Sequence, residues 1–172
     1  MKKAILIIIA AIFLMLAAGC GSSDVPDGMS RASVEADSFD FFVPNGWTVN
    51  NGTGTASAFY STSDKSNVSF IAMVAGSDMS DFDEYIEKAD ASFASTLNGY
   101  SGISERKETT MCGQKAISFE YRATADGNEY RFLQVVTFRG LNFYVFTYTA
   151  LAEKYEDHLG DVEKIIENVR FK

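Results

Sequence analysis

Alternation of apolar and polar residues is clearest between residues 114 and 124. Apolar side chains occupy every second position from Ile117 to Ala123, and polar side chains occupy the positions between them. This period of two is typical of a strand that buries one face and exposes the other. The dipeptide Asp126-Gly127 follows, and it is favoured in two-residue hairpin turns. The pattern therefore predicts an antiparallel hairpin whose second strand covers residues 129–138.

Residues 142–151 carry a different pattern, because they are apolar on both sides. Phe143 and Val145 would point to one face of a strand. Tyr144 and Phe146 would point to the opposite face. A strand of this kind needs cover on both faces. Further strand patterns are predicted over residues 34–43, 47–49, 56–61, 67–75 and 103–110.

Two segments repeat their apolar residues at steps of three and four, which is the period of an amphipathic helix. The first covers residues 81–98, with Ser80 as its expected N-cap and acids in its first turn. The second runs from Tyr155 to Val169, and its other face is rich in Glu, Lys and Asp. Together with the strands, these helices predict an α+β fold. We expect an antiparallel sheet with helices on both faces, which is an α/β/α sandwich.

The first twenty residues have the anatomy of an export signal. Lys2 and Lys3 precede residues 4–18, which contain no polar side chain, and Gly19-Cys20 follows. As a helix, residues 4–18 would rise roughly 22 Å, less than the ~30 Å thickness of a hydrocarbon core. We therefore expect the leader to be cleaved.

The run from Leu16 to Cys20 resembles the lipobox of bacterial lipoproteins, whose cysteine is acylated before the leader is removed. The resemblance implies lipid attachment, palmitate included, at Cys20 and a location on the extracytoplasmic face of the cell membrane. A plain secretory signal or an uncleaved anchor is the alternative, and Cys20 could then form a disulfide with Cys112. We divide the chain into a lipoprotein signal peptide (1–19), a flexible tether reaching about 20 Å (20–33) and a folded domain (34–172).

Composition and charge narrow the choice of partner. Hydrophobic residues make up 47% of the chain, which is enough for a folded core. Acidic side chains outnumber basic ones 23 to 15, whereas a nucleic-acid surface needs clustered Lys and Arg, so nucleic acid is not expected as a partner. Removal of residues 1–19 takes away two lysines and leaves 13 basic against 23 acidic side chains, a net charge of −10. An anionic bilayer would repel that charge within about 8–10 Å, so the lipid must hold the protein at the membrane.

Several short motifs resemble the PsbP-like superfamily, which is named after an extrinsic protein of photosystem II. The resemblance begins with Phe39-Asp40-Phe41 and Pro44-Asn45-Gly46-Trp47, and it ends with Tyr148-Thr149-Ala150 and Val169-Arg170-Phe171. It covers about residues 36–171. The superfamily also includes a Ran-GTPase-binding factor of the Mog type and many bacterial lipoproteins of unassigned role. The resemblance implies a non-catalytic binding or assembly module without a cofactor, and it carries over no photosystem role.

The densest group of carboxylates is a candidate metal site. Asp78, Asp81, Asp83 and Glu84 supply the oxygen ligands that Ca²⁺ prefers. Acids in the first turn of a helix also complement the positive end of its dipole. The twelve-residue calcium-loop pattern is absent, which favours capping over calcium binding.

His158 and Cys112 are the candidates for catalysis. His158 is the only histidine, so a multi-histidine metal site is excluded and a Ser-His-Asp enzyme has one possible base. We expect it at solvent or at the edge of the apolar stripe of its helix. Lys107 and Lys115 could lower the pKa of Cys112, but an inert, half-buried thiol is the preferred interpretation. A hydrolase using either residue is the last-ranked hypothesis.

Aromatic side chains are the remaining candidates, as anchors for a partner or as core residues. Our first hypothesis is a membrane-anchored lipoprotein whose domain binds a protein or envelope component without catalysis. The alternative is a domain that binds a small apolar ligand, in a cleft between the sheet and a helix, or Ca²⁺. The aromatic side chains considered as interaction anchors are Trp47, Tyr144 and Tyr148, with Tyr60, Tyr100 and Tyr130 as further members of the group.

Overall fold

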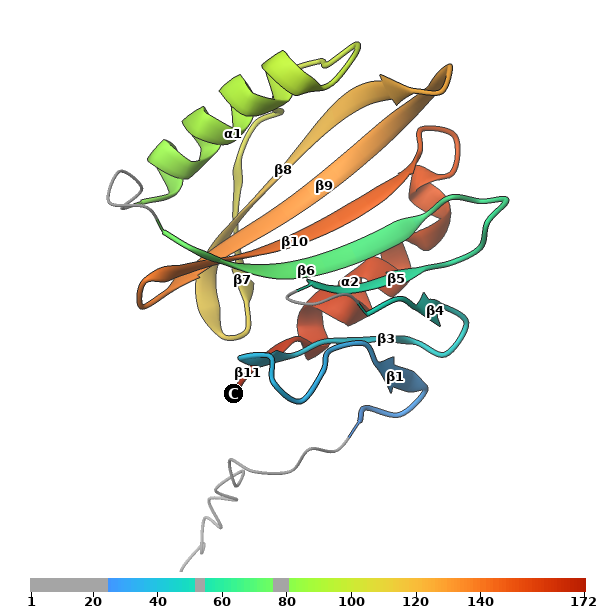
Figure 1. Ribbon diagram of the computed structural model, residues 1–172, viewed down its shortest axis with the longest axis vertical. Helices are drawn as coiled ribbons and strands as arrows, with labels where there is room; N and C mark the ends of the chain where they lie inside the picture. Colours follow the sequence, from blue (N-terminus) through green and yellow to red (C-terminus); the bar gives the residue numbers. More distant parts are fainter. Residues whose placement is uncertain (1–24, 52–54, 76–80) are drawn as a thin grey trace, which may run out of the picture.

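A large antiparallel sheet forms the centre of the computed structural model (Figure 1), which describes residues 25–51, 55–75 and 81–172. In these ranges seven strands form the sheet, in the order β4-β5-β6-β10-β9-β8-β7. Two short pairs, β1 with β3 and β11 with β2, lie beside it. The elements are β1 (Met29–Arg31), β2 (Phe39–Asp40), β3 (Phe42–Pro44), β4 (Thr48–Val49), β5 (Thr55–Phe59), β6 (Asn67–Val74), α1 (Phe82–Thr96), β7 (Lys107–Met111), β8 (Gln114–Ala125), β9 (Asn128–Arg139), β10 (Asn142–Leu151), the 3₁₀ helix η1 (Tyr155–His158), α2 (Leu159–Asn168) and β11 (Arg170–Phe171).

The predicted α+β class with a large antiparallel sheet is confirmed. The two strands of the predicted hairpin, β8 and β9, are the longest strands in the described ranges. β8 and β9 pair in register from Ala116 with Thr137 to Ala125 with Asn128. The turn residues Asp126 and Gly127 have φ angles of 51° and 76°, as a type I′ turn requires. β10 has the bounds predicted from its two apolar faces.

Neighbouring side chains of β10 belong to different hydrophobic clusters. Phe143 and Val145 pack in a cluster that includes Tyr85 of α1, whose ring centroid lies 5.2 Å from that of Phe143. Phe146 packs in the other cluster, with Ile165 of α2. Burying a side chain of this size stabilises the fold by roughly 1.5–3 kcal/mol. The apolar residues on both faces of β10 therefore indicate, in the sequence, that each face is covered by a helix.

The folded part of the chain begins before residue 34, where the tether was expected to end. β1 pairs with β3, so that Arg31 lies opposite Phe42. Ala32 is fully buried, and the hydroxyl of Ser33 accepts a hydrogen bond of 3.0 Å from the amide of Phe41. These residues are small or polar, so their role lies in backbone pairing that hydropathy does not reveal.

Two local predictions need correction. α1 is capped by Asp81, whose carboxylate accepts a hydrogen bond from the amide of Glu84, and Ser80 lies outside the described residues. The helix predicted over residues 155–169 is divided into η1 and α2.

Residues 98–106 run along the outer edge of β8 beyond the end of β7. Backbone amides of Ser101 and Ser104 donate to the carbonyls of Arg122 and Glu120 at 3.1 and 2.8 Å. The two serine hydroxyls accept hydrogen bonds from the amides of the same two β8 residues, at 2.9 and 2.8 Å. The edge of β8 is thus hydrogen-bonded by a segment that is not itself a regular strand.

No helix within the described ranges is long and apolar enough to cross a membrane.

A pair of truncations tests the position of the domain boundary. A chain that starts at residue 34 loses the β1–β3 ladder and the buried Ala32. We expect it to be less stable by about 2 kcal/mol or more, a fall in Tm of roughly 4–8 °C by calorimetry. A chain that starts at residue 25 keeps these contacts and should melt with the full-length protein. Equal melting of both truncations would contradict the boundary.

Candidate functional site

Several ionisable and aromatic side chains come together at η1, where the chain passes from β10 into α2. Each of the four residues of η1 has a hydrogen bond to a charged or aromatic residue outside η1. We use the name η1 cluster for the residues at the centre of these contacts. It consists of Asp64, Glu120, Arg131, Tyr155, Glu156 and His158.

His158 is buried, contrary to the expectation that it lies at solvent or at the edge of the apolar stripe. Its Nε2 lies 3.1 Å from Oδ2 of Asp64, and only 9% of its side chain is exposed. Its ring packs on Tyr60 and Trp47, at centroid distances of 4.2 and 5.6 Å. η1 has three residues per turn instead of 3.6, so the helical wheel used for the prediction does not apply at this position.

The loop between β5 and β6 holds Asp64 against His158. Oδ1 of Asp64 accepts a hydrogen bond of 3.1 Å from the amide of Ser66, and the Asp64 amide donates to the Ser61 hydroxyl at 3.1 Å. Burial tends to raise the pKa of Asp64, but hydrogen bonds from Ser66 and His158 outweigh it, so the pKa lies below its ordinary value. The carboxylate is therefore ionised at neutral pH.

The three aromatic residues predicted as interaction anchors are buried, which corrects that prediction. Trp47, Tyr144 and Tyr148 are 4%, 3% and 0% exposed. Their polar atoms have partners inside the protein: Trp47 Nε1 donates to Asp161 at 2.9 Å, and the Tyr148 hydroxyl donates to the Tyr155 carbonyl at 2.9 Å. These residues pack the core and are not exposed as anchors.

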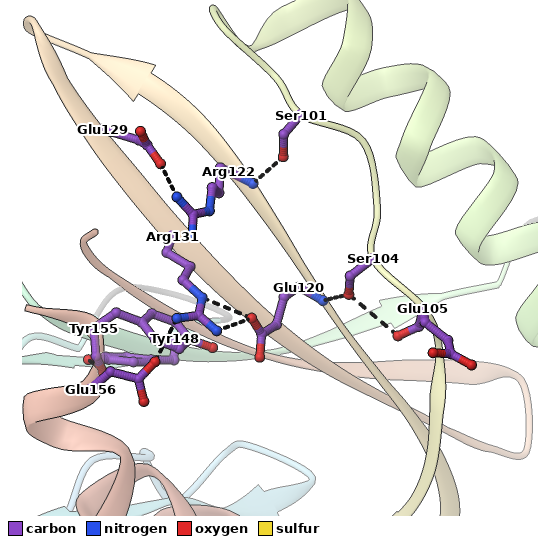
Figure 2. Close-up of polar contacts among 10 residues, drawn as sticks. All are labelled: Ser101, Ser104, Glu105, Glu120, Arg122, Glu129, Arg131, Tyr148, Tyr155 and Glu156. Carbon is purple, nitrogen blue, oxygen red and sulfur yellow. Dashed lines mark hydrogen bonds and ion pairs between the residues drawn. The ribbon is translucent and has the colours of Figure 1, made fainter. Parts of the chain in front are cut away.

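Arg131 is the centre of the other half of the η1 cluster (Figure 2). Its Nε and Nη2 donate to Oε2 of Glu120 at 2.9 and 2.7 Å, and its Nη1 donates to Glu156 at 2.6 Å. Its guanidinium lies 3.9 Å from the ring centroid of Tyr155. Burial raises the pKa of Tyr155 above its ordinary range, so its hydroxyl stays protonated. The sequence analysis did not identify Arg131, although its predicted hairpin places it one step diagonally from Glu120.

The contacts of the η1 cluster are those of a structural contact between elements and not those of a catalytic site. His158 uses one ring nitrogen with Asp64, and its ring contacts the rings of Tyr60 and Trp47. Among the contacts recorded for the described residues, no hydroxyl or thiol is hydrogen-bonded to the ring. A nucleophile oriented by the base is what a Ser-His-Asp or Cys-His mechanism requires. The arrangement instead holds the β5–β6 loop against the start of α2.

The three candidate calcium ligands within the described residues, Asp81, Asp83 and Glu84, do not form a group of metal ligands. Asp81 caps α1, and Asp83 forms an ion pair with Arg106, whose guanidinium already supplies the positive charge. Asp78 lies outside the described residues. In the ranges that the structure describes, no three His, Cys, Asp or Glu side chains are grouped as metal ligands. The calcium hypothesis for Asp78, Asp81, Asp83 and Glu84 stays a prediction.

Cys112 lies in the turn between β7 and β8, with a φ of 53°. Burial raises the pKa of its thiol to about 12, against an opposing effect of Arg139. The thiol is therefore protonated at neutral pH, as expected for an inert cysteine. Cys20, the predicted lipid-attachment residue, lies outside the described residues.

Comparison with protein families supports the sequence resemblance. A family model described as PsbP matches residues 27–171, which include every strand and helix given above. No curated protein matches the chain.

Solved structures with the same fold include proteins from a cyanobacterium, a mycobacterium and a yeast. The solution structure of cyanobacterial PsbP (CyanoP) from Synechocystis sp. PCC 6803 is 17% identical, with a TM-score of 0.58, and the alignment covers 91% of this chain and 99% of that one. LpqN, described as involved in cell envelope biogenesis of Mycobacterium tuberculosis, is 15% identical, with a TM-score of 0.56 and coverages of 84% and 91%. The Saccharomyces cerevisiae Ran-binding protein Mog1p is 9% identical, with a TM-score of 0.55 and coverages of 83% and 95%. At these identities the similarity shows the fold alone.

Replacing Asp64 by Asn tests the contact with His158 through its pH dependence. A carboxylate with a lowered pKa stabilises the native state above its unfolded pKa, near pH 4, and loses this contribution as the pH falls further. We expect Asp64→Asn to be less stable than the native protein by about 1–2 kcal/mol at pH 7, with a difference that shrinks below about pH 4. Urea denaturation at several pH values measures this. Asp157→Asn, which removes an exposed carboxylate paired with Lys154, is the matched control and should change little. A constant deficit across the pH range would contradict the assignment.

Replacing Arg131 by Met tests the other half of the cluster while keeping an unbranched side chain. We expect a loss of about 1–2 kcal/mol in urea denaturation, because Glu120 is left beside Tyr155 without its partner. Arg122→Met removes the half-exposed pair with Glu129 and should cost less than about 0.5 kcal/mol. Similar losses in the two variants would show that Arg131 has no special structural role.

Proposed function

Because the chain belongs to the PsbP family, we propose that it is a membrane-anchored, extracytoplasmic lipoprotein whose PsbP-like domain binds a protein or envelope component without catalysis. The proposal joins a family assignment, which covers the domain, to the leader and lipobox-like run, which lie ahead of it in the sequence.

The observation that carries the proposal is the short distance along the chain between Cys20 and the domain. The family match begins at residue 27, and the described, paired backbone begins with a hydrogen bond from the Met29 amide to the Pro26 carbonyl. Residues 21–25 can span at most ~18 Å, even when fully extended. An acyl group on Cys20 would thus keep the domain close to the membrane, with a shorter maximum separation than a tether ending at residue 33 would give.

This spacing also orients the domain. Figure 1 shows β1 and β3 at one end of the molecule and α1 at the opposite end. A lipid attached just ahead of β1 would place the β1–β3 end towards the bilayer. The α1 end and the far end of the sheet would then face away from the membrane, where an envelope partner can reach them.

The non-catalytic part of the proposal rests on what the reactive side chains do. His158 is buried against Tyr60 and hydrogen-bonded to Asp64, and the thiol of Cys112 has a raised pKa. Two of the proteins that share the fold are described as a Ran-binding protein and as a protein involved in cell envelope biogenesis. The first description shows that this fold can serve a binding role.

Lipid attachment is tested by labelling cells with an alkyne-bearing palmitate and then separating membranes from soluble protein. We expect the native chain to be labelled and membrane-bound, and Cys20→Ser to be unlabelled and released. Cys112→Ser is the matched control, and it should remain labelled and membrane-bound. A labelled Cys20→Ser chain, or loss of the label in Cys112→Ser, would refute the anchoring at Cys20.

Partner binding is tested separately, by crosslinking in intact cells and purification of the tagged native chain from membranes. We expect one protein or envelope component to be enriched over a tagged, unrelated lipoprotein. Failure to enrich any component, with anchoring intact, would refute the binding role and leave the anchor unaffected.

A further inference from the structure

α1 covers only part of the sheet face on which it packs. Along β10, residues 143–146 are all buried, so both faces of the strand are covered over this stretch. From residue 147 to residue 151 burial alternates instead. Tyr148 and Ala150 are buried in the cluster that α2 shares with the sheet, and the residues between them are only half-buried. Beyond residue 146, the side of β10 that faces away from α2 is therefore incompletely covered.

The two neighbouring strands extend this incompletely covered surface. In β5 and β6 the buried positions again belong to the cluster of α2, and the positions between them are half-buried. Within the described ranges, no residue of β5 belongs to the cluster in which α1 packs. We use the name open face for the half-buried residues on this side of β5, β6, β9 and β10. They are Thr55, Ser57, Phe59, Asn67, Ser69, Phe132, Thr147 and Thr149.

The register of the sheet arranges the open face in rows across the strands. Phe59 lies opposite Asn67, Asn67 lies opposite Thr149, and Thr149 lies opposite Phe132. This row begins and ends with an aromatic ring and has an amide and a hydroxyl between the rings. Adjacent strands are ~4.8 Å apart, so the row extends about 14 Å. The next row carries three hydroxyl groups, on Ser57, Ser69 and Thr147.

The open face carries no charged residue, although 22% of the chain is charged. The opposite face of the sheet is different where its strands are exposed. There Glu120, Arg122 and Arg131 occupy β8 and β9 and form ion pairs. A charged ligand would find no counter-charge among the residues of the open face. The charge pattern therefore favours a neutral ligand.

Several polar groups of the open face are free to bond a ligand. Within the described residues, the hydroxyls of Ser69 and Thr149 have no hydrogen-bond partner, whereas that of Thr147 accepts a hydrogen bond of 3.4 Å from Gln134. Asn67 uses one N–H with the carbonyl of Lys65 at 3.1 Å, which leaves its second N–H and its carbonyl oxygen. A hydroxyl group can donate one hydrogen bond and accept two. The surface thus offers both donors and acceptors to a partner.

The combination of uncharged hydrogen-bonding groups and an aromatic ring matches the chemistry of a saccharide. A sugar ring carries hydroxyl groups around its edge, which donate to and accept from hydroxyl and amide side chains. Its faces carry C–H groups, which pack against an aromatic ring because both surfaces are apolar. A protein surface is rich in charged side chains, and covering them without a partner is costly. The open face therefore suits a neutral saccharide better than a protein.

We propose that the open face binds a neutral oligosaccharide of the cell envelope. Asn67, Ser69 and Thr149 form hydrogen bonds with the sugar hydroxyls, and a sugar ring stacks on Phe59. This inference rests on the proposed function, because it assigns the envelope component to the class of neutral glycans.

Titration of the full chain with glycans from the envelope of the cells that naturally produce it tests the proposal. Anion-exchange chromatography separates these glycans into a neutral and an anionic fraction, and the chain is kept in a detergent without a sugar headgroup. We expect the neutral fraction to bind at least tenfold more tightly in calorimetry and to shift the ¹⁵N–¹H signals of Ser69 and Thr149. Absence of binding by the neutral fraction, or equal binding of the anionic fraction, would overturn the proposal.

Thr149→Val and Phe59→Leu test the two kinds of contact, since the first removes a hydroxyl and the second removes an aromatic ring. Thr109→Val is the matched control, because Thr109 is a half-buried threonine on the other face of the sheet, in β7. We expect each open-face variant to bind the neutral fraction about tenfold more weakly, and the control to bind as the native chain does. Thermal melting identifies a variant that has failed to fold. Native affinity in both open-face variants would refute binding at this face.

Failure of this inference is distinguishable from failure of the proposed function. If crosslinking enriches a protein while the neutral glycan fraction does not bind, the saccharide site is refuted and the binding role stands. If crosslinking enriches no component, the binding role itself is refuted.

Discussion

The structure depends on the need to cover both faces of β10. This strand lies inside the sheet, between β6 and β9, so its backbone is hydrogen-bonded on both edges. Its side chains are apolar on both faces, and exposure of either face would cost several kcal/mol. Tyr85 of α1 packs in the same cluster as Phe143, and Ile165 of α2 packs in the same cluster as Phe146. This constraint accounts for the packing of one helix in each hydrophobic cluster.

The η1 cluster fixes where the second helix begins. A chain that leaves β10 must turn sharply to bring α2 back over the sheet, and η1 makes that turn. His158 is buried there, and burial of a polar ring is unfavourable unless the ring is hydrogen-bonded. Asp64 supplies the partner for His158, and Arg131 pairs with the exposed Glu156 at the same turn. These contacts hold the start of α2 against the sheet and the β5–β6 loop.

Local signals were sufficient for much of the fold and insufficient for the site. The hairpin could be predicted because Asp126-Gly127 and the alternation on either side of it lie within one short window. His158 was misplaced because its partner Asp64 is 94 residues away in the sequence, and no pattern near His158 reveals it. β1 was missed for a similar reason, since residues 29–33 have almost no apolar periodicity and are held by backbone pairing with β3. The burial of Trp47 depends on Asp161, which is 114 residues away.

The segment along the outer edge of β8 would matter most if the proposed lipid anchor confines the protein to a membrane surface. Molecules fastened to a bilayer meet one another in two dimensions, at a far higher local concentration than in free solution. An unpaired strand edge is a template for the growth of intermolecular sheets. Here Ser101 and Ser104 occupy both the amides and the carbonyls of Glu120 and Arg122. Neighbouring copies on the same membrane would thus find no unpaired backbone at this part of the sheet, and they could stay densely packed without forming intermolecular sheets.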